Sequence, residues 1–322
     1  MKRILTGLKP TGNGIHIGNY MGAVKPFLDL IKGQEAFLFI ADFHSLTSVH
    51  NGETLKKYKL EMILEYMAMV GDLDNVTIFE QSKVRRINDI TWILSSLTPY
   101  SMMLRAHSFK DSQAKNAEIN MATFNYPILM ASDIISYDAD IVPVGKDQIQ
   151  HLEFARDIAG YFNKNYICDT FKLPNCHIDK ELQTIPGIDG RKMSKSYNNF
   201  IPVFASEKEI KKSIMSIVTD DTPLELPKNP DTCNVFALIK LFATQDRQNQ
   251  IRQKYLAGNY GYGHAKLELL EIILDYFGHI RQRKAELEKN LDFVYDKLAK
   301  GNKIANEIVD KKYEEILKVV GL

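Results

Sequence analysis

The sequence has few of the features that mark a secreted, metal-binding or membrane protein. Its 322 residues include only three cysteines, none in a C-x-x-C pair, so neither a zinc site nor a disulfide framework is expected. No apolar run reaches the roughly 18 residues of a membrane span, and the N-terminal residues lead directly into a predicted strand instead of a signal peptide. We therefore expect a cytoplasmic protein that has no membrane partner and no metal-ligating residues.

A dominant charge is also missing. Lysine and arginine together number 41 against 40 acidic residues, which gives a net charge of +1. This balance excludes a generally basic nucleic-acid binder, although it allows a local basic face. With 45% apolar residues, the chain has enough material for the cores of one or two domains.

Predicted strands and helices alternate through the first half of the chain. Continuous apolar runs predict strands that are buried on both faces, and apolar residues at spacings of three and four predict the helices between them. The strands are expected at residues 4–8, 36–42, 76–79 and 141–144, and the helices at 20–31, 53–70 and 126–137. This alternation predicts a doubly wound α/β domain with a parallel sheet, in which ligands bind at the carboxyl ends of the strands.

Two glycine-containing turns follow predicted strands. The first runs from Thr11 to Asn19 and contains His16, and the second lies at 145–148. A strand, a glycine turn and a helix N-terminus together form a common phosphate cradle. Because no G-x-G-x-x-G is present, a dinucleotide site is not indicated. For His16, a structural hydrogen bond and contact with a ligand are equally open.

A basic loop and a buried carboxylate complete the set of candidate site features. The loop from Lys192 to Ser196 places two lysines among serines, which suits a polyphosphate, although a solvated basic loop is the alternative. Asp133 falls inside the apolar helix predicted at 126–137. Since an unpaired buried carboxylate is costly, Asp133 needs a partner, either within the protein or on a ligand that donates a hydrogen bond.

The rest of the chain is predicted to be mainly helical. The strand signal stops at about 82–125, which predicts an insertion of the kind that often pairs subunits. Trp92, Met102 and Met103 lie in this insertion, and we favour core positions for them over an interface. Beyond residue 200, the helices carry basic residues that either face solvent or grip RNA: Lys266, Arg281, Arg283, Lys284, Lys289 and Lys300.

Two motifs carry a family resemblance. PTGNGIHIGNYMGA at 10–23 and DGRKMSKS at 189–196, in this order, resemble the nucleotide-binding motifs of class I aminoacyl-tRNA synthetases. Within that class, ADFHSLT (41–47), SFKDS (108–112), the stretch 126–159 and the terminal helical region resemble the tryptophanyl-tRNA synthetase family along essentially the whole chain. This chain departs from the family pattern at Lys9, where glutamine is common, and has one extra residue before His16. It also has Ser112 where many relatives have a second lysine, and the sequence leaves open whether Lys115 replaces it.

The resemblance implies an architecture and an activity. It implies a Rossmann-type catalytic domain at 1–186 with a dimerisation insertion at about 82–125, a loop at 187–200, a helical anticodon-binding domain at 201–300 and a C-terminal helix at 301–322, which can pack back on the catalytic domain. The implied reaction activates L-tryptophan with ATP and Mg²⁺ and transfers it to tRNA(Trp), and the implied assembly is a homodimer.

The resemblance also assigns site residues. It implies catalytic roles for His16, Lys192 and Lys195. It implies contact with ATP for Lys9, Pro10, Thr11, Gly18, Asn19, Gly145, Lys146, Asp147, Gln183, Ile185, Lys192, Met193, Ser194, Lys195 and Ser196. For tryptophan it implies Asp133 as the acceptor of the indole N–H, together with Leu5, Met130, Ile134, Val144, His44 and Gln148.

Three alternative functions are open at this point. A tyrosyl-tRNA synthetase has the nearest fold, and a small-molecule nucleotidylyltransferase shares the histidine-containing turn. A non-catalytic binding protein descended from a synthetase is the third. The lysine loop and the appended helices disfavour the second alternative, and the intact His16, Lys192, Lys195 and Asp147 disfavour the third.

Overall fold

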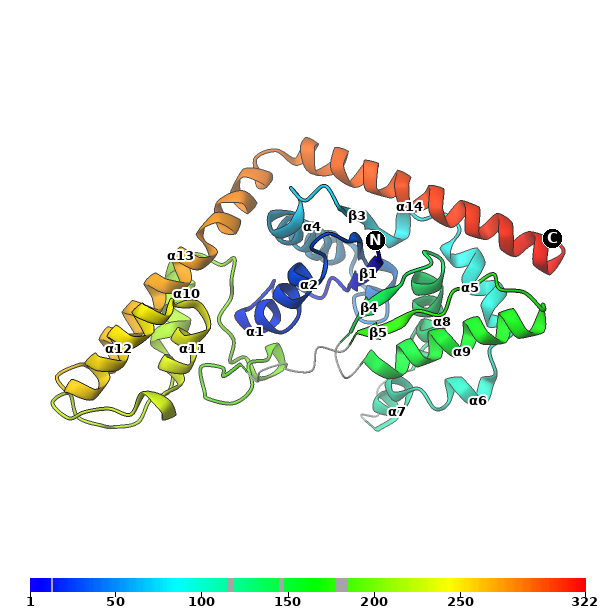
Figure 1. Ribbon diagram of the computed structural model, residues 1–322. Coiled ribbons are helices and arrows are strands. Elements are labelled where there is room, and N and C mark those ends of the chain that lie inside the picture. The colour runs from blue at the N-terminus through cyan, green and yellow to red at the C-terminus, as the bar shows by residue number, and fades with distance from the viewer. Residues whose placement is uncertain (13, 115–118, 145–147, 178–184) are drawn as a thin grey trace. The chain divides into compact units, whose positions relative to one another are not determined.

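The computed structural model describes residues 1–12, 14–114, 119–144, 148–177 and 185–322 (Figure 1). The chain forms two compact units. Unit 1 comprises Met1–Gly12, Phe27–Lys180 and Asn290–Leu322, and unit 2 comprises Asn13–Pro26 and Glu181–Lys289. Residues 13–26 thus group with the helical region, and the terminal helix groups with the sheet.

Unit 1 is built on a five-stranded parallel sheet, which confirms the predicted doubly wound α/β fold. The strand order is β3-β2-β1-β4-β5. Ile4 of the central strand pairs with Ala36 on one side and Ile141 on the other. The strands are β1 (Arg3–Leu8), β2 (Glu35–Ile40), β3 (Val76–Glu80), β4 (Ile141–Pro143) and β5 (Asn175–His177). The sequence did not indicate β5, because its three residues are short of any apolar run.

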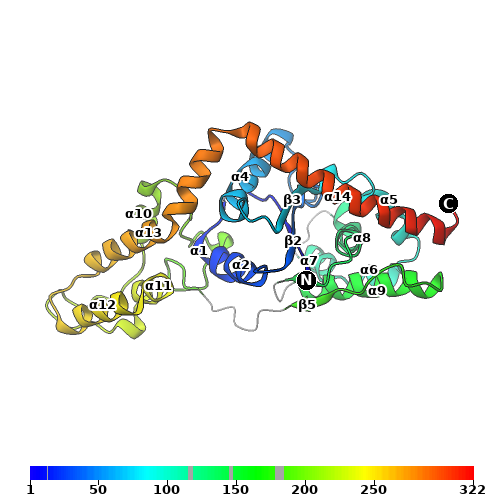
Figure 2. The same cartoon turned by 45° about the horizontal axis from the view of Figure 1, so that its top comes forward.

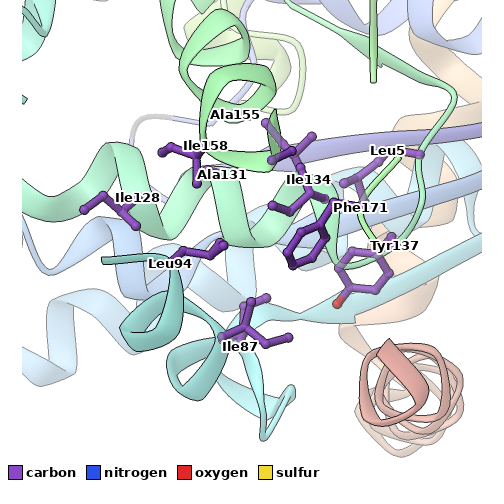
Figure 3. Packing of buried hydrophobic residues seen from close by; sticks show 14 of the residues in the cluster. Leu5, Ile87, Leu94, Ile128, Ala131, Ile134, Tyr137, Ala155, Ile158 and Phe171 are labelled. Carbon is purple, nitrogen blue, oxygen red and sulfur yellow. The ribbon is translucent and has the colours of Figure 1, made fainter. Parts of the chain in front are cut away.

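The helices of unit 1 pack on the sheet through one large apolar cluster. Leu5 of β1 lies with Ile134 and Ala155, and this cluster extends to Ile87 and Leu94 (Figure 3). The other four residues come from α5 (Ile87–Ser95), α8 (Met121–Ile135) and α9 (Ile149–Asn165). The close packing fixes α8 against the sheet and therefore fixes the position of Asp133, which α8 carries.

Further helices of unit 1 follow the strands or form part of the insertion. They are α3 (Asp42–Ser45), α4 (Gly52–Val70), α6 (Tyr100–Met103) and α7 (His107–Ala114). Met102 and Met103 are buried as expected, whereas Trp92 is 79% exposed. The core position expected for Trp92 is therefore wrong, because its side chain lies on the outward face of α5.

The last helix, α14 (Leu291–Val320), lies along the edge strand β3 (Figure 2). It is continuous across the domain boundary expected at 300/301. A Cβ atom at Gly301 would collide with the carbonyl oxygen of Ile78, so only glycine allows this close approach. The next residue, Asn302, accepts the Glu80 backbone N–H at 2.9 Å and donates to Glu80 Oε2 at 3.2 Å.

Unit 2 combines a short N-terminal segment with the helices after residue 200. The predicted helix at 20–31 is in fact a series of α1 (Ile17–Asn19), the π-helical turn η1 (Tyr20–Val24) and α2 (Lys25–Leu30). Tyr20 meets Phe277 edge to face at 4.8 Å between ring centroids. The later helices are α10 (Glu207–Met215), α11 (Asn234–Phe242), α12 (Gln245–Ala257) and α13 (Tyr262–Glu288). Within the described part of the chain, no helix is long and apolar enough to cross a membrane.

Candidate active site

In unit 1, the buried carboxylate of Asp133 is the centre of a polar cluster. Asp133 is only 2% exposed. Its Oδ2 accepts a hydrogen bond from Gln81 Nε2 at 2.7 Å and lies 2.9 Å from His44 Nε2. Burial raises the pKa of Asp133, and the hydrogen bonds from His44 and Gln81 oppose that rise. The partners that Asp133 requires are therefore side chains of unit 1.

Tyr126 and His151 form a second pair of polar side chains next to His44. The His44 ring meets the Tyr126 ring edge to face at 5.9 Å between centroids. The Tyr126 hydroxyl lies 2.6 Å from Nε2 of the buried His151. This arrangement joins α3, α8 and α9 through side chains near the ends of the central strands.

The apolar residues assigned to tryptophan lie in or against the core of unit 1. Leu5 and Ile134 belong to the buried cluster, and Met130 and Val144 pack against it. Gln148 is half-buried immediately before α9. All four apolar positions are thus on the same core as the helix that carries Asp133.

The residues that follow β1 are tied to the segment that follows β2. Lys9 Nζ donates to Thr47 Oγ1 at 2.8 Å, and burial lowers the pKa of Lys9. Ser45 Oγ donates to the carbonyl of Pro10 at 3.0 Å. Thr11 is exposed beside them. These contacts place the start of the first glycine turn at the carboxyl edge of the sheet, where the sequence predicted a ligand site.

In unit 2, His16 caps the short helix α1. Its Nδ1 accepts the backbone N–H of Asn19 at 3.2 Å, so Nε2 carries the proton of the neutral ring. Burial and the positive charge of Lys195 lower the pKa of His16 to about 4. Near neutral pH, His16 is therefore an uncharged hydrogen-bond donor.

The first turn packs directly on the lysine loop within unit 2. The Gly18 N–H points to Met193 Sδ at 3.2 Å, across 175 positions of sequence. A Cβ atom at Gly18 would lie 3.0 Å from the His16 ring and 3.2 Å from Met193 Cβ, so glycine permits this contact. Ile17 N–H also donates to the Ile201 carbonyl at 3.0 Å. The two motifs recognised in the sequence are thus neighbours in space.

The conformation of the lysine loop depends on Asn199, which is 2% exposed. Asn199 Oδ1 accepts the Ser194 N–H at 2.7 Å. Its Nδ2 donates to Asp189 Oδ1 at 2.7 Å and to the Lys192 carbonyl at 3.1 Å. One amide side chain therefore links three points of the loop.

The side chains of the loop differ in exposure. Met193 is buried and donates its N–H to the carbonyl of the buried Ile185 at 2.8 Å. Lys192 and Ser196 are exposed, whereas Lys195 and Ser194 are half-buried. The loop therefore presents its charge outward on an anchor of apolar contacts.

The structure separates the predicted site residues into two groups. Asp133 and His44 lie in unit 1 with Lys9, Pro10 and Thr11, whereas His16, Gly18 and Asn19 lie in unit 2 with Lys192 to Ser196. Gly145, Lys146, Asp147, Gln183 and Lys115 lie outside the described residues.

Sequence reasoning missed the roles of Gln81 and Asn199. The available signal for Gln81 was its place directly after a buried strand. For Asn199 it was an amide beside the apolar Phe200-Ile201.

Some of the basic residues expected to face solvent or RNA have internal partners. Lys266 Nζ donates to the Met215 carbonyl at 3.0 Å. Arg281 Nη1 donates to the carbonyls of Val203 and Ala205 at 2.6 and 2.8 Å. Because these two side chains hold unit 2 together, the expectation of a free polar face does not apply to them.

Comparisons with known proteins identify the family of this chain. The family model for class I tRNA synthetases of tryptophan and tyrosine (W and Y) matches residues 1–278. A tryptophan–tRNA ligase of Fusobacterium nucleatum is 51% identical over 100% of this chain and 98% of its own length. The corresponding ligase of Campylobacter jejuni is 42% identical over 99% of this chain and 100% of its own. The chain belongs to the tryptophanyl-tRNA synthetase family.

Solved structures of tryptophanyl-tRNA synthetases have the same fold. The Campylobacter jejuni enzyme complexed with ADP and tryptophan matches with a TM-score of 0.96 at 42% identity, covering 99% of this chain and 100% of that one. The Mycoplasma pneumoniae enzyme matches with a TM-score of 0.79 at 26% identity, covering 100% and 98%. The resemblance found in the sequence is confirmed, and the protein is an enzyme with tryptophan–tRNA ligase activity. These full-length relatives favour it over the tyrosyl and nucleotidylyltransferase alternatives.

Proposed function

We propose that this ligase recognises L-tryptophan through Asp133 and activates it with ATP to tryptophanyl-adenylate. The observation that carries the proposal is the buried carboxylate of Asp133, whose two hydrogen bonds described above both go to Oδ2. Its Oδ1 then accepts the indole N–H. An amino acid without that N–H would leave a buried acceptor unpaired, which penalises it by several powers of ten.

The remaining tryptophan contacts follow from the same cluster. Leu5, Met130, Ile134 and Val144 supply the apolar walls, and Gln148 orients the ammonium end. His44 lies 2.9 Å from Asp133, so we assign it to the indole side, where it orients the acceptor. The Campylobacter jejuni relative, solved with ADP and tryptophan, supports binding of both kinds of ligand by this fold.

Activation joins the tryptophan carboxylate to the α-phosphorus of ATP as pyrophosphate departs. No protein nucleophile is needed, because the substrate carboxylate forms the new P–O bond. His16 donates from Nε2–H to a phosphate oxygen, and Lys192 and Lys195 neutralise the charge that develops on the departing pyrophosphate. The other ATP contacts are Lys9, Pro10, Thr11, Gly18, Asn19, Gly145, Lys146, Asp147, Gln183, Ile185, Met193, Ser194 and Ser196.

We infer that Mg²⁺ enters bound to the ATP phosphates. Among the residues that the structure describes, no three His, Cys, Asp or Glu side chains gather in a way that could hold a metal ion. The lysine loop offers cations, which suit phosphate oxygens and repel a metal. The ion therefore supplies charge neutralisation as part of the substrate.

Transfer to tRNA completes the reaction. A terminal ribose hydroxyl of tRNA(Trp) takes the acyl group from the adenylate, and the helical region at 201–300 contacts the anticodon end. A cytoplasmic homodimer is the proposed assembly. Trp92 and Tyr100 support it, because they are 79% and 69% exposed on the helical insertion and large exposed apolar side chains favour a protein interface.

Amino-acid-dependent ATP–pyrophosphate exchange, measured with each of the twenty amino acids, tests the proposed specificity. Tryptophan is expected to support exchange, and tyrosine and phenylalanine are expected to be roughly 10³-fold or more less efficient in kcat/KM, since neither offers a ring N–H. Efficient exchange with tyrosine, or none with tryptophan, would contradict the proposal.

A further inference from the structure

Gln81 contacts the carboxylate of Asp133 and was not among the residues assigned from the sequence. It is the first residue of the 3₁₀ turn η2 (Gln81–Lys83), directly after β3, and is 1% exposed. Its Nε2 donates to Asp133 Oδ2 at 2.7 Å, and its Oε1 accepts the Phe43 backbone N–H at 3.0 Å. Because Oε1 is committed to a backbone donor, the amide can present only its NH₂ group to Asp133.

We propose that Gln81 is a positioning residue for tryptophan recognition, which holds the Asp133 carboxylate so that Oδ1 accepts the indole N–H. Gln81 and His44 approach the same oxygen, Oδ2, from different elements. Two donors on one oxygen fix the rotation of the carboxylate and leave the other oxygen for a ligand. This inference rests on the proposed role of Asp133 and extends it to the residue that orients it.

The electrostatic surroundings of Asp133 give Gln81 a second effect. The groups that face Asp133 are His44 and Asp42 from the segment after β2, Tyr137 after α8, and Gln81 itself. Burial and the Asp42 carboxylate raise the pKa of Asp133, whereas His44 and Gln81 lower it. Loss of the Gln81 donor therefore raises this pKa further. Only the ionised carboxylate is free to accept hydrogen bonds at both oxygens. On acidification, a variant without this donor should therefore lose tryptophan recognition at a higher pH than the wild type does.

The backbone on either side of Gln81 is held independently of its side chain. Glu80 N–H donates to Asn302 Oδ1 at 2.9 Å, and Ser82 N–H donates to Asp42 Oδ1 at 2.9 Å. A substitution at residue 81 should therefore change the amide contacts without changing the path of the chain. This makes the role of the side chain testable by mutation.

The test uses Gln81→Met, which keeps the length of the side chain and removes its polar groups. Pyrophosphate exchange is measured for tryptophan and for 3-benzothienylalanine, in which sulfur replaces the ring N–H. The ratio of kcat/KM for tryptophan to that for the analogue is expected to fall roughly tenfold, mainly through KM for tryptophan, because the acceptor is no longer oriented. KM for ATP should change little. The defect should shrink as the pH rises from about 6 to about 9.

Gln34→Met is the matched control. Gln34 Oε1 accepts the Lys2 backbone N–H at 2.7 Å, and the residue lies at the opposite end of β2 from Phe43. The Gln34→Met variant therefore loses one hydrogen bond from a side chain to the backbone without affecting Asp133. Its ratio of kcat/KM for tryptophan to that for the analogue should equal that of the wild type. Gln81→Asn retains an amide that is one methylene too short, and an intermediate ratio is expected if Gln81→Met does not fold.

The outcomes separate this inference from the function on which it rests. A wild-type ratio and pH profile in both Gln81 variants would overturn the inference, while wild-type preference for tryptophan would leave the proposed function intact. If the wild-type enzyme itself does not distinguish tryptophan from the analogue, the role of Asp133 is wrong, and the role of Gln81 is wrong with it.

Discussion

At the scale of single residues, His16 shows how a capping contact can fix the chemistry of a ring. Its Nδ1 accepts the Asn19 N–H, which leaves Nε2–H as the only donor of the neutral ring. Burial and Lys195 keep that ring neutral. The sequence left structural and ligand-binding roles equally open. The structure shows Nδ1 in the helix cap, and the proposed function assigns Nε2–H to a phosphate.

The low pKa of His16 predicts a pH dependence of stability. An unfolded histidine gains its proton near its ordinary value of 6.5, whereas folded His16 gains it only near a pKa of about 4. Between these values the unfolded state binds more protons, so the free energy of unfolding falls as the pH falls through this range. In His16→Asn, which can still cap α1, this part of the loss should disappear.

Urea midpoints measured at several pH values across that range test the expectation. The wild type should lose stability on acidification more steeply than His16→Asn. Replacing the exposed His279 by Asn serves as the control and should give the wild-type slope. Equal dependence of the urea midpoint on pH in the wild type and His16→Asn would show that folding does not lower the pKa of His16.

At the scale of elements, the sequence predicted those strands and helices that have a regular apolar pattern. Four strands were found because each is a short apolar run buried on both faces, and the later helices were found from their periodicity. β5 was missed because Asn175 and His177 are polar, and α7 because its residues lack an apolar stripe. α14 begins at Leu291, ten residues before the start at 301 that was expected for the C-terminal helix.

The candidate site was predictable to the extent that motifs marked it. His16, Asp133 and the lysine loop stand out in the sequence. The roles of Gln81 and Asn199 depend on contacts that join distant segments, and a single glutamine or asparagine gives no local sign of such a partner. The sequence also could not show that the first turn is shared between the two units, because the contact of Gly18 with Met193 spans 175 positions.

Alanine substitutions of Gly301 in α14 and Gly278 in α13 should have opposite effects on stability, because only Gly301 lies against β3. Gly301→Ala would place a methyl group against the Ile78 backbone, where no side chain can move aside, and should destabilise the protein by about 1–3 kcal/mol. Gly278→Ala in α13 meets nothing within 4 Å and should be neutral or stabilising by up to about 1 kcal/mol. Urea midpoints give both values, and equal midpoints for the two variants would contradict the close packing.

At the scale of the whole molecule, each unit draws on separate parts of the chain. Unit 1 needs three segments, and the segments of unit 2 are inserted between them. The tryptophan group of residues belongs to unit 1, and His16 with the lysine loop belongs to unit 2. A continuous fragment that contains either set therefore also includes residues of the other unit.

The proposed assembly predicts the effect of a charge at Trp92. Because this side chain is 79% exposed on α5, Trp92→Glu should separate a homodimer into monomers without unfolding it. Sedimentation velocity measures the mass, and circular dichroism checks the fold. Tyr295→Glu, at a 52% exposed aromatic residue of α14, is the control and should stay dimeric. A dimeric Trp92→Glu would place the interface elsewhere.

The position of α14 also sets an order of events during protein synthesis. All five strands lie within the first 177 residues, but the helix that lies along edge strand β3 comes from residues 291–320. As the chain leaves the ribosome, the sheet can pair its strands early, yet α14 becomes available to cover β3 only after more than a hundred further residues are translated. An open edge strand can pair with other chains, so α14 protects this edge only at the end of synthesis.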